Sequence, residues 1–201
     1  MSKLYFKGYK VVELVFIRHG QTNWNLEGKL QGIIDIPLND RGVEEAILLS
    51  SKIDKEFKKI ISSPLDRALK TAQIVNNNLN IPIELEERIM ERNFGELAGQ
   101  EASFVKTMRE STKDYGVETI KDFTNKLLDF LGDCSKLESG RYLVFTHGGV
   151  IISLLSHLSS NKINWENTPI KNCSLTGLKY SQNWEIDFIN SHALDINKIS
   201  C

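Results

Sequence analysis

The feature that most constrains the fold is an apolar run, Val11–Ile17, that ends at Arg18 and His19. The run is rich in Val and its one charged residue is Glu13, a pattern typical of a strand buried on both faces in a parallel sheet. In open α/β sheets ligands bind at the carboxyl ends of the strands, because the loops that leave them surround a crevice. Arg18 and His19 are therefore candidate site residues, and Gly20 would let the backbone turn there without a side-chain clash.

A second apolar run, residues 141–146, also ends in a histidine, since His147, Gly148 and Gly149 follow it. A single histidine after a strand is at least as often held by a backbone hydrogen bond as it is catalytic. Two strands that both end in His-Gly are more informative, because parallel strands bring their carboxyl ends to one edge of the sheet. We therefore expect His19 and His147 to lie together.

The whole chain alternates between predicted strands and helices, which predicts an α/β fold: a three-layer α/β/α sandwich with a mostly parallel central sheet and helices on both faces. A chain of 201 residues, 41% of them hydrophobic and 25% charged, is ordinary for one globular domain, which we expect to span 1–201. Two alternating stretches predict a hairpin around residues 181–183. The predicted strands are 11–17, 58–62, 81–85 and 141–146, and the predicted helices are about 40–56, from Pro64 onward, 118–131 and 149–158.

Two of these helices have recognisable starts. Asn39 is a predicted N-cap, and Ser63 is another, because Pro64 and Asp66 follow it at the expected positions. Arg67 then falls in the first turn, where unpaired backbone N–H groups and the helix dipole favour an anion. Its place after a strand favours the crevice over solvent. The helix after Asn39 is predicted to bury one face, made of Val43, Ala46, Ile47, Ser50 and Ile53.

Charge and hydropathy exclude several classes of partner. The chain has 25 basic and 26 acidic residues and a net charge of −1, so it lacks an electrostatic footprint for nucleic acid or for an anionic membrane. Its apolar runs are far shorter than the roughly 20 residues of a membrane span. The basic N-terminus has no apolar core of the kind found in signal peptides. We therefore expect a cytoplasmic protein.

Cysteine and metal-ligand patterns lead to a related expectation. Cys134, Cys173 and Cys201 are odd in number and widely spaced, which supports neither a disulfide framework nor a zinc site. No cluster of carboxylates or imidazoles has metal-ligand spacing, and the sequence has no P-loop motif. We expect chemistry that uses no metal and no cofactor.

Five motifs relate the chain to a known family. They are Arg18–Thr22 (RHGQT), Gln31–Leu38 (QGxxDxPL), Ser62–Ala72 (SSPLDRAxxTA), Glu91–Glu96 (ERNFGE) and Phe145–Gly149 (FTHGG). In this order, over about Val11–Tyr180, the sequence resembles the histidine phosphatase superfamily, also called phosphoglycerate mutase-like. Within it, the chain resembles the phosphatase branch that holds the broad-specificity and alpha-ribazole phosphatases.

The resemblance and the residue chemistry lead to the same mechanism. A phosphoryl group accounts for two arginines and two imidazoles at one rim, because its oxygens accept many charged hydrogen bonds. We expect His19 to be the nucleophile that becomes phosphohistidine. The resemblance implies that Glu91 is the general acid and base, and that Arg18, Arg67 and His147 hold the phosphoryl charge. The predicted substrate-binding residues are Gly20, Gln21, Thr22, Asn25, Gln31, Gly32, Arg92 and Gly148.

The predicted function is that of a histidine acid-type phosphatase, a metal-independent phosphomonoesterase acting on a small phosphorylated metabolite. Glu91 must be protonated when the ester binds, which predicts better turnover at mildly acidic pH. A homodimer is possible for such a chain. Two motifs depart from the family pattern, at 95–99 and 117–119, and leave the choice of substrate open.

Two rival functions remain open at this point. One is a cofactor-dependent phosphoglycerate mutase, because ERNFG resembles the mutase form of this motif and Arg92 could bind a second acidic group. Against it, His147 follows Glu91 by only 56 positions, whereas such mutases carry a long basic insertion there. The other is a catalytically silent phosphate-binding protein, although none of the five predicted catalytic residues is missing.

Residues 98–117 are predicted to form a flap over the site, with a plain surface helix as the competing interpretation. Lys106 and Arg109 are three residues apart and would share a helix face. If that face points inward, we expect a preference for small substrates that carry a second acidic group.

Overall fold

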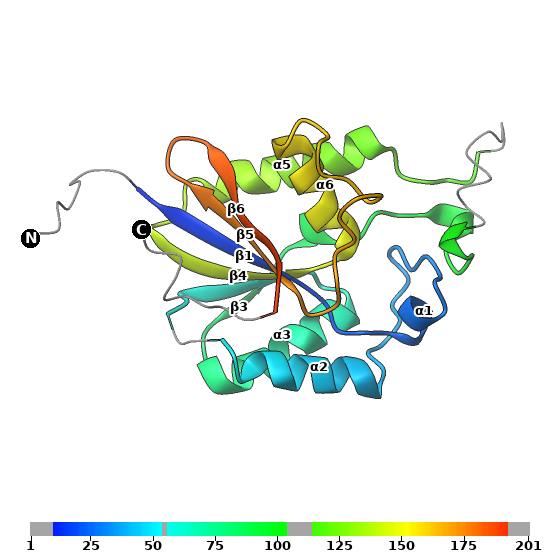
Figure 1. Cartoon of the computed structure of the whole chain (residues 1–201), viewed down its shortest axis with the longest axis horizontal. Helices are drawn as coiled ribbons and strands as arrows, with labels where there is room; N and C mark the ends of the chain where they lie inside the picture. Colours follow the sequence, from blue (N-terminus) through cyan, green and yellow to red (C-terminus); the bar gives the residue numbers. More distant parts are fainter. Residues whose placement is uncertain (1–9, 54–55, 104–113, 193–201) are drawn as a thin grey trace, which may run out of the picture.

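The computed structural model describes residues 10–53, 56–103 and 114–192, in which six strands form one sheet (Figure 1). The strands lie in the order β3-β2-β4-β1-β5-β6. The pairs β1 with β4, β4 with β2 and β2 with β3 are parallel, and β5 and β6 join antiparallel at one edge, so the predicted mostly parallel sheet is confirmed. The strand bounds are β1 Val12–Arg18, β2 Lys59–Ser62, β3 Ile83–Leu85, β4 Gly140–Thr146, β5 Leu175–Tyr180 and β6 Trp184–Ser191.

Helices cover both faces of this sheet, as predicted. The helices α2 (Asp40–Ser50) and α3 (Asp66–Leu79) lie on one side and α5 (Ile120–Cys134) and α6 (Gly148–Leu158) on the other (Figure 1). Strand β1 contributes side chains to the hydrophobic core on each face of the sheet, because successive side chains of a strand point to opposite faces. Leu14 and Phe16 belong to the buried cluster that includes α5 and α6, whereas Val15 and Ile17 belong to the cluster of α2 and α3.

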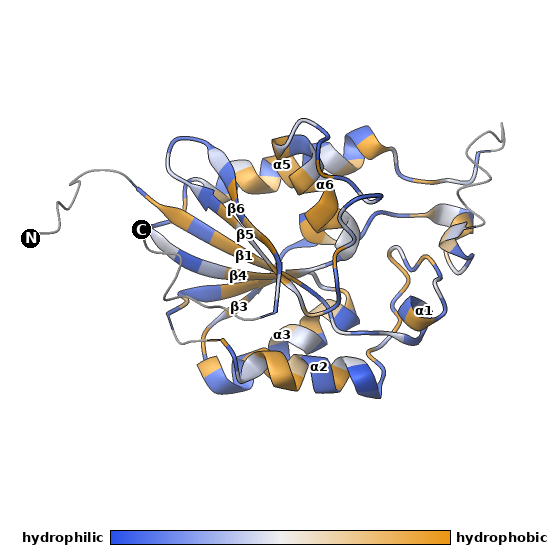
Figure 2. Cartoon of the chain, in the orientation of Figure 1, coloured by the Kyte–Doolittle hydropathy of each residue, from blue (hydrophilic) through white to orange (hydrophobic). Residues whose placement is uncertain are grey.

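The hydrophobic residues lie where the helices pack against the sheet. Hydrophobic residues are concentrated along β1 and in α6 (Figure 2). Short helical turns occupy the connections, namely α1 (Asn23–Leu26), η1 (Glu87–Ile89) and η2 (Gly95–Leu97). The predicted terminal hairpin is confirmed, with β5 and β6 joined around residues 181–183. In the described parts of the chain no helix combines the length and apolar character that crossing a membrane requires.

Helix α2 differs from its prediction at its carboxyl end. Asn39 caps it as expected, because its side-chain oxygen accepts the Gly42 N–H at 2.9 Å. The helix stops at Ser50, six residues early, and Ile47 is 58% exposed instead of buried. Ile53 and Phe57 are buried beyond the end of the helix, so the chain leaves the helical path to place them in the core.

Cys134 and Cys173 are buried and free. Burial raises the pKa of each thiol to about 12, so both remain protonated and unreactive at neutral pH. Cys201 lies outside the described residues.

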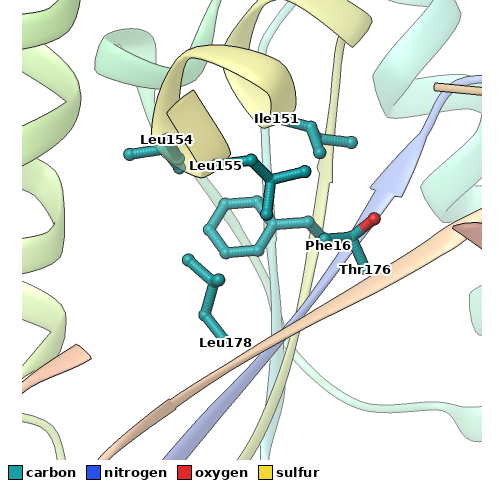
Figure 3. Close-up of a pocket in the computed structure, with 6 residues that line it drawn as sticks. All are labelled: Phe16, Ile151, Leu154, Leu155, Thr176 and Leu178. Carbon is teal, nitrogen blue, oxygen red and sulfur yellow. The ribbon is translucent and has the colours of Figure 1, made fainter. Parts of the chain in front are cut away.

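Thr176 places a hydroxyl group in the apolar layer between α6 and the sheet. Its neighbours around a small gap are Phe16, Ile151, Leu154, Leu155 and Leu178 (Figure 3). The Thr176 Oγ1 is buried and has no hydrogen-bond partner. A buried hydroxyl without a partner lowers stability, so Thr176→Val is expected to raise the free energy of unfolding by about 1 kcal/mol.

Chemical denaturation measures this difference, and Thr146→Val is the matched control. The Thr146 Oγ1 is also buried but donates to the Ile89 carbonyl at 2.7 Å, so the same replacement there is expected to destabilise the protein. A loss of stability in Thr176→Val would contradict the prediction.

Candidate active site

The ends of β1 and β4 bring two histidines together. The register pairs Arg18 with Thr146, and the His19 N–H donates to the Thr146 carbonyl at 2.9 Å. The His19 and His147 rings follow directly, with their centroids 5.3 Å apart. Both side chains are buried.

Close backbone approach explains the glycine that follows His19. A Cβ atom on Gly20 would lie 2.4 Å from the Gly42 carbonyl oxygen, so the exit of β1 packs directly on the start of α2. The Gly20 N–H donates to the Thr71 Oγ1 at 3.1 Å, and that hydroxyl donates to the Arg67 carbonyl at 2.7 Å. The backbone beside His19 is therefore held by α2 and α3 together.

The His19 ring has a defined protonation state. Its Nδ1 lies 2.7 Å from the Gly20 carbonyl oxygen, which can only accept, so Nδ1 carries the proton and Nε2 keeps its lone pair. Burial, together with the positive charges of Arg67 and Arg18, holds the pKa of His19 well below its usual value. The ring is thus neutral at neutral pH, and a neutral imidazole of fixed tautomer can act as a nucleophile.

Arg67 is fully buried and so does not face solvent, while its place at a ligand-binding crevice stays a prediction. Its two terminal nitrogens donate to the carbonyls of Ile34 at 2.8 Å and Gly32 at 2.7 Å, which ties the loop after α1 to α3. Burial lowers the pKa of Arg67 to about 10, so the guanidinium stays charged at neutral pH. Arg18 also contacts a loop, since one of its terminal nitrogens donates to the Ile170 carbonyl at 2.5 Å.

Unpartnered polar atoms gather among the predicted site residues. In the parts of the chain that the structure covers, five buried side-chain polar atoms have no hydrogen-bond partner. Four of them belong to predicted site residues: Arg18 Nε, Arg67 Nε, His147 Nδ1 and Gln31 Oε1. Buried polar groups are nearly always paired, so these atoms are candidates for contacts with a polar ligand. Three of the four can donate a hydrogen bond, which suits an anion.

Ser63 contacts His147, a role that the sequence analysis missed. Its Oγ lies 2.8 Å from His147 Nε2, which leaves Nδ1 as the unpartnered atom. Ser63 was predicted to cap α3, but that helix begins at Asp66, with Leu65 at the N-cap and no side-chain cap. The prediction is wrong because the hydroxyl lies beside the buried imidazole of His147, the residue that follows β4. The parallel register of β2 and β4, which pairs Ser62 with Phe145, could have indicated this contact.

Glu91 lies in the connection after η1, and its carboxylate contacts the start of α6. One carboxylate oxygen accepts the Gly149 N–H at 3.0 Å and the other accepts the Arg92 N–H at 2.9 Å. A Cβ on Gly149 would clash with the Glu91 carboxylate, so a larger residue there would displace that carboxylate from its place. Glu91 also raises the pKa of Arg18 and Arg67 against the larger effect of burial, so its carboxylate lies near both cations.

Several predicted substrate-binding residues have partners within the protein that order the loop after β1, and their contact with a substrate stays a prediction. The Thr22 and Asn25 side chains each accept the other's backbone N–H at 3.2 Å and form the capping box of α1. The Gln21 side chain accepts from Asn39 at 3.1 Å. Asn172, which the sequence analysis also missed, donates to the His19 carbonyl at 2.8 Å and to Asn25 at 3.3 Å.

The remaining predicted residues have different surroundings. Gly32 supplies a carbonyl to Arg67, and Gly148 is the first residue of α6. The Arg92 Nε donates to the Glu118 carbonyl at 2.7 Å, and its guanidinium lies over the Phe94 ring, so it packs on the 93–97 segment. Lys106 and Arg109, on which the specificity prediction depended, lie outside the described residues.

The chain is similar to several known proteins in sequence and in structure. The phosphatase PhoE of Bacillus subtilis (strain 168), itself called uncharacterized, is 33% identical over 88% of this chain and 94% of PhoE. The phosphoglycerate mutase-like protein 4 of Arabidopsis thaliana is 36% identical over 71% of this chain and 69% of its own length. The crystal structure of phosphoserine phosphatase from Entamoeba histolytica, in complex with 3-phosphoglyceric acid, is 26% identical with a TM-score of 0.76, over 90% of this chain and 97% of that one.

A profile of the histidine phosphatase superfamily (branch 1) matches residues 14–192, which include the ends of β1 and β4, the start of α3 and Glu91. The match covers most of the chain and the whole of the site just described. This chain belongs to the histidine phosphatase superfamily.

Proposed function

We propose that the protein is a phosphomonoesterase that cleaves small phosphate esters through a phosphohistidine intermediate on His19. The observation that carries this proposal is the group of buried, unpartnered polar atoms on Arg18, Arg67 and His147 beside a neutral His19. Phosphoryl oxygens are acceptors that suit these donors. The likeness to PhoE, a protein called a phosphatase, supports hydrolysis as the outcome.

The proposed reaction has two steps. The His19 Nε2 attacks phosphorus in line while the bond to the leaving oxygen breaks, and Glu91 donates a proton to that oxygen. The two arginines and His147 stabilise the charge on the equatorial oxygens. Glu91 then takes a proton from water, whose oxygen attacks phosphorus and releases inorganic phosphate and neutral His19.

A mutase is the alternative, supported by the ERNFG motif and by the likeness to a phosphoglycerate mutase-like protein. The short segment between Glu91 and His147 favours the phosphatase. Assays with and without added 2,3-bisphosphoglycerate distinguish the two, because brisk hydrolysis of an aryl phosphate without it is expected only of a phosphatase.

Hydrolysis of p-nitrophenyl phosphate is expected to persist in excess EDTA. The proposed nucleophile is a side chain, and the proposed charge stabilisers are two arginines and a histidine, so no step needs an ion. Among the described residues, no group of three or more His, Cys, Asp or Glu side chains could hold a metal. Initial rates before and after chelation test this. Activity that is lost in EDTA and returns with magnesium would rule out the proposed mechanism.

A further inference from the structure

Trp165 is a large aromatic residue that lies against the site and yet is 53% exposed. It belongs to the connection between α6 and β5. A Cβ atom on Gly148 would lie 2.9 Å from the Trp165 ring and 3.4 Å from Arg18 Nε. The edge of the indole therefore reaches the start of α6, next to an arginine nitrogen that has no partner in the protein.

The segment that carries Trp165 is well ordered by hydrogen bonds. The Asn164 side chain accepts the Glu166 N–H at 3.0 Å, and the Asn167 side chain both accepts the Asn164 N–H at 2.9 Å and donates to the Lys162 carbonyl at 2.8 Å. Further along, the Ile170 carbonyl accepts from Arg18. The backbone that carries the indole is thus ordered before any ligand binds, which lowers the entropic cost of a contact with the ring.

The position of Glu91 indicates which part of a substrate would meet this ring. Glu91, the proposed proton donor to the leaving oxygen, accepts the Gly149 N–H, and Trp165 packs on the adjacent Gly148. A leaving group whose oxygen lies beside Glu91 would therefore lie close to the exposed indole. Aromatic faces attract planar and apolar groups.

We propose that Trp165 contacts the leaving group and gives the enzyme a preference for phosphomonoesters whose leaving group is planar or apolar. This inference rests on the proposed function, because it takes the leaving oxygen to lie beside Glu91.

Binding of two non-hydrolysable ligands, benzylphosphonate and methylphosphonate, tests the contact apart from turnover. Calorimetry on the wild type, Trp165→Ala and Trp165→Phe is expected to show tighter binding of benzylphosphonate by the wild type. Trp165→Ala should raise the Kd for benzylphosphonate by about three- to tenfold, which corresponds to the usual energy of one aromatic contact. The change in the Kd for methylphosphonate should be much smaller. Trp165→Phe should restore most of the difference, because it keeps an aromatic face.

Turnover of benzyl phosphate and ethyl phosphate gives a second measurement. For Trp165→Ala we expect KM for benzyl phosphate to rise and kcat to change little, as when binding remote from the chemistry is lost. If Trp165→Ala weakens the binding of both phosphonates equally, or changes the binding of neither, the proposal is overturned. If the wild type hydrolyses neither ester but still prefers benzylphosphonate through Trp165, the contact stands and the proposed function fails.

Discussion

His19→Ala is expected to lower kcat/KM for an aryl phosphate by at least about ten-thousandfold, and to abolish covalent incorporation of phosphate. The Gly20 carbonyl fixes the proton on Nδ1, so Nε2 is the nucleophilic atom. The lowered pKa of His19 keeps that atom unprotonated at neutral pH. Without it, the arginines could still bind the ester but no group would attack phosphorus.

Labelling with a radioactive phosphate ester, followed by an alkaline quench and peptide mapping at alkaline pH, identifies the phosphorylated residue. A phosphohistidine is labile in acid and stable in base, which distinguishes it from a phosphoserine. His157→Ala is the matched control, because His157 is an exposed histidine at the far end of α6 and should leave both rate and label unchanged. Label on His147, or on a serine such as Ser63, would show that the nucleophile is misassigned.

Glu91→Gln is expected to slow turnover by about a hundred- to ten-thousandfold, the usual contribution of general acid–base catalysis. The amide keeps the size of the carboxylate but cannot transfer a proton. The effect on the first step should depend on the leaving group. Nitrophenolate is a good leaving group even when it is not protonated, whereas an alkoxide must be protonated in order to leave. The loss of activity should therefore be larger for an alkyl phosphate than for p-nitrophenyl phosphate.

The second step gives a sharper test of Glu91. If Glu91 also deprotonates the attacking water, Glu91→Gln should accumulate phosphohistidine during turnover of p-nitrophenyl phosphate, visible as a burst of nitrophenol. Glu44→Gln is the control, since Glu44 is an exposed residue of α2. An equal loss of activity on alkyl and aryl esters, with no burst, would indicate that Glu91 only positions Gly149 and Arg92.

The sequence by itself determined the parallel core of the fold and where the site lies on it. Apolar runs such as Val11–Ile17 are local signals, because burial on both faces requires nearly every residue of the strand to be apolar. The Asn39 cap is local too, since its partner is three residues away. Parallel pairing then follows from the alternation of strands and helices, and it places His19 beside His147.

Only the tertiary structure decided which polar side chains are paired within the protein and which are buried without a partner. Ser63, Thr71 and Asn172 find their partners on distant segments, and no local pattern records those distances. The same holds for α2, which ends early because Ile53 and Phe57 fill the core beyond it. The periodicity of the local sequence specifies which face of a helix or strand a residue occupies. Its hydrogen-bond partner depends instead on which distant segments pack against that face.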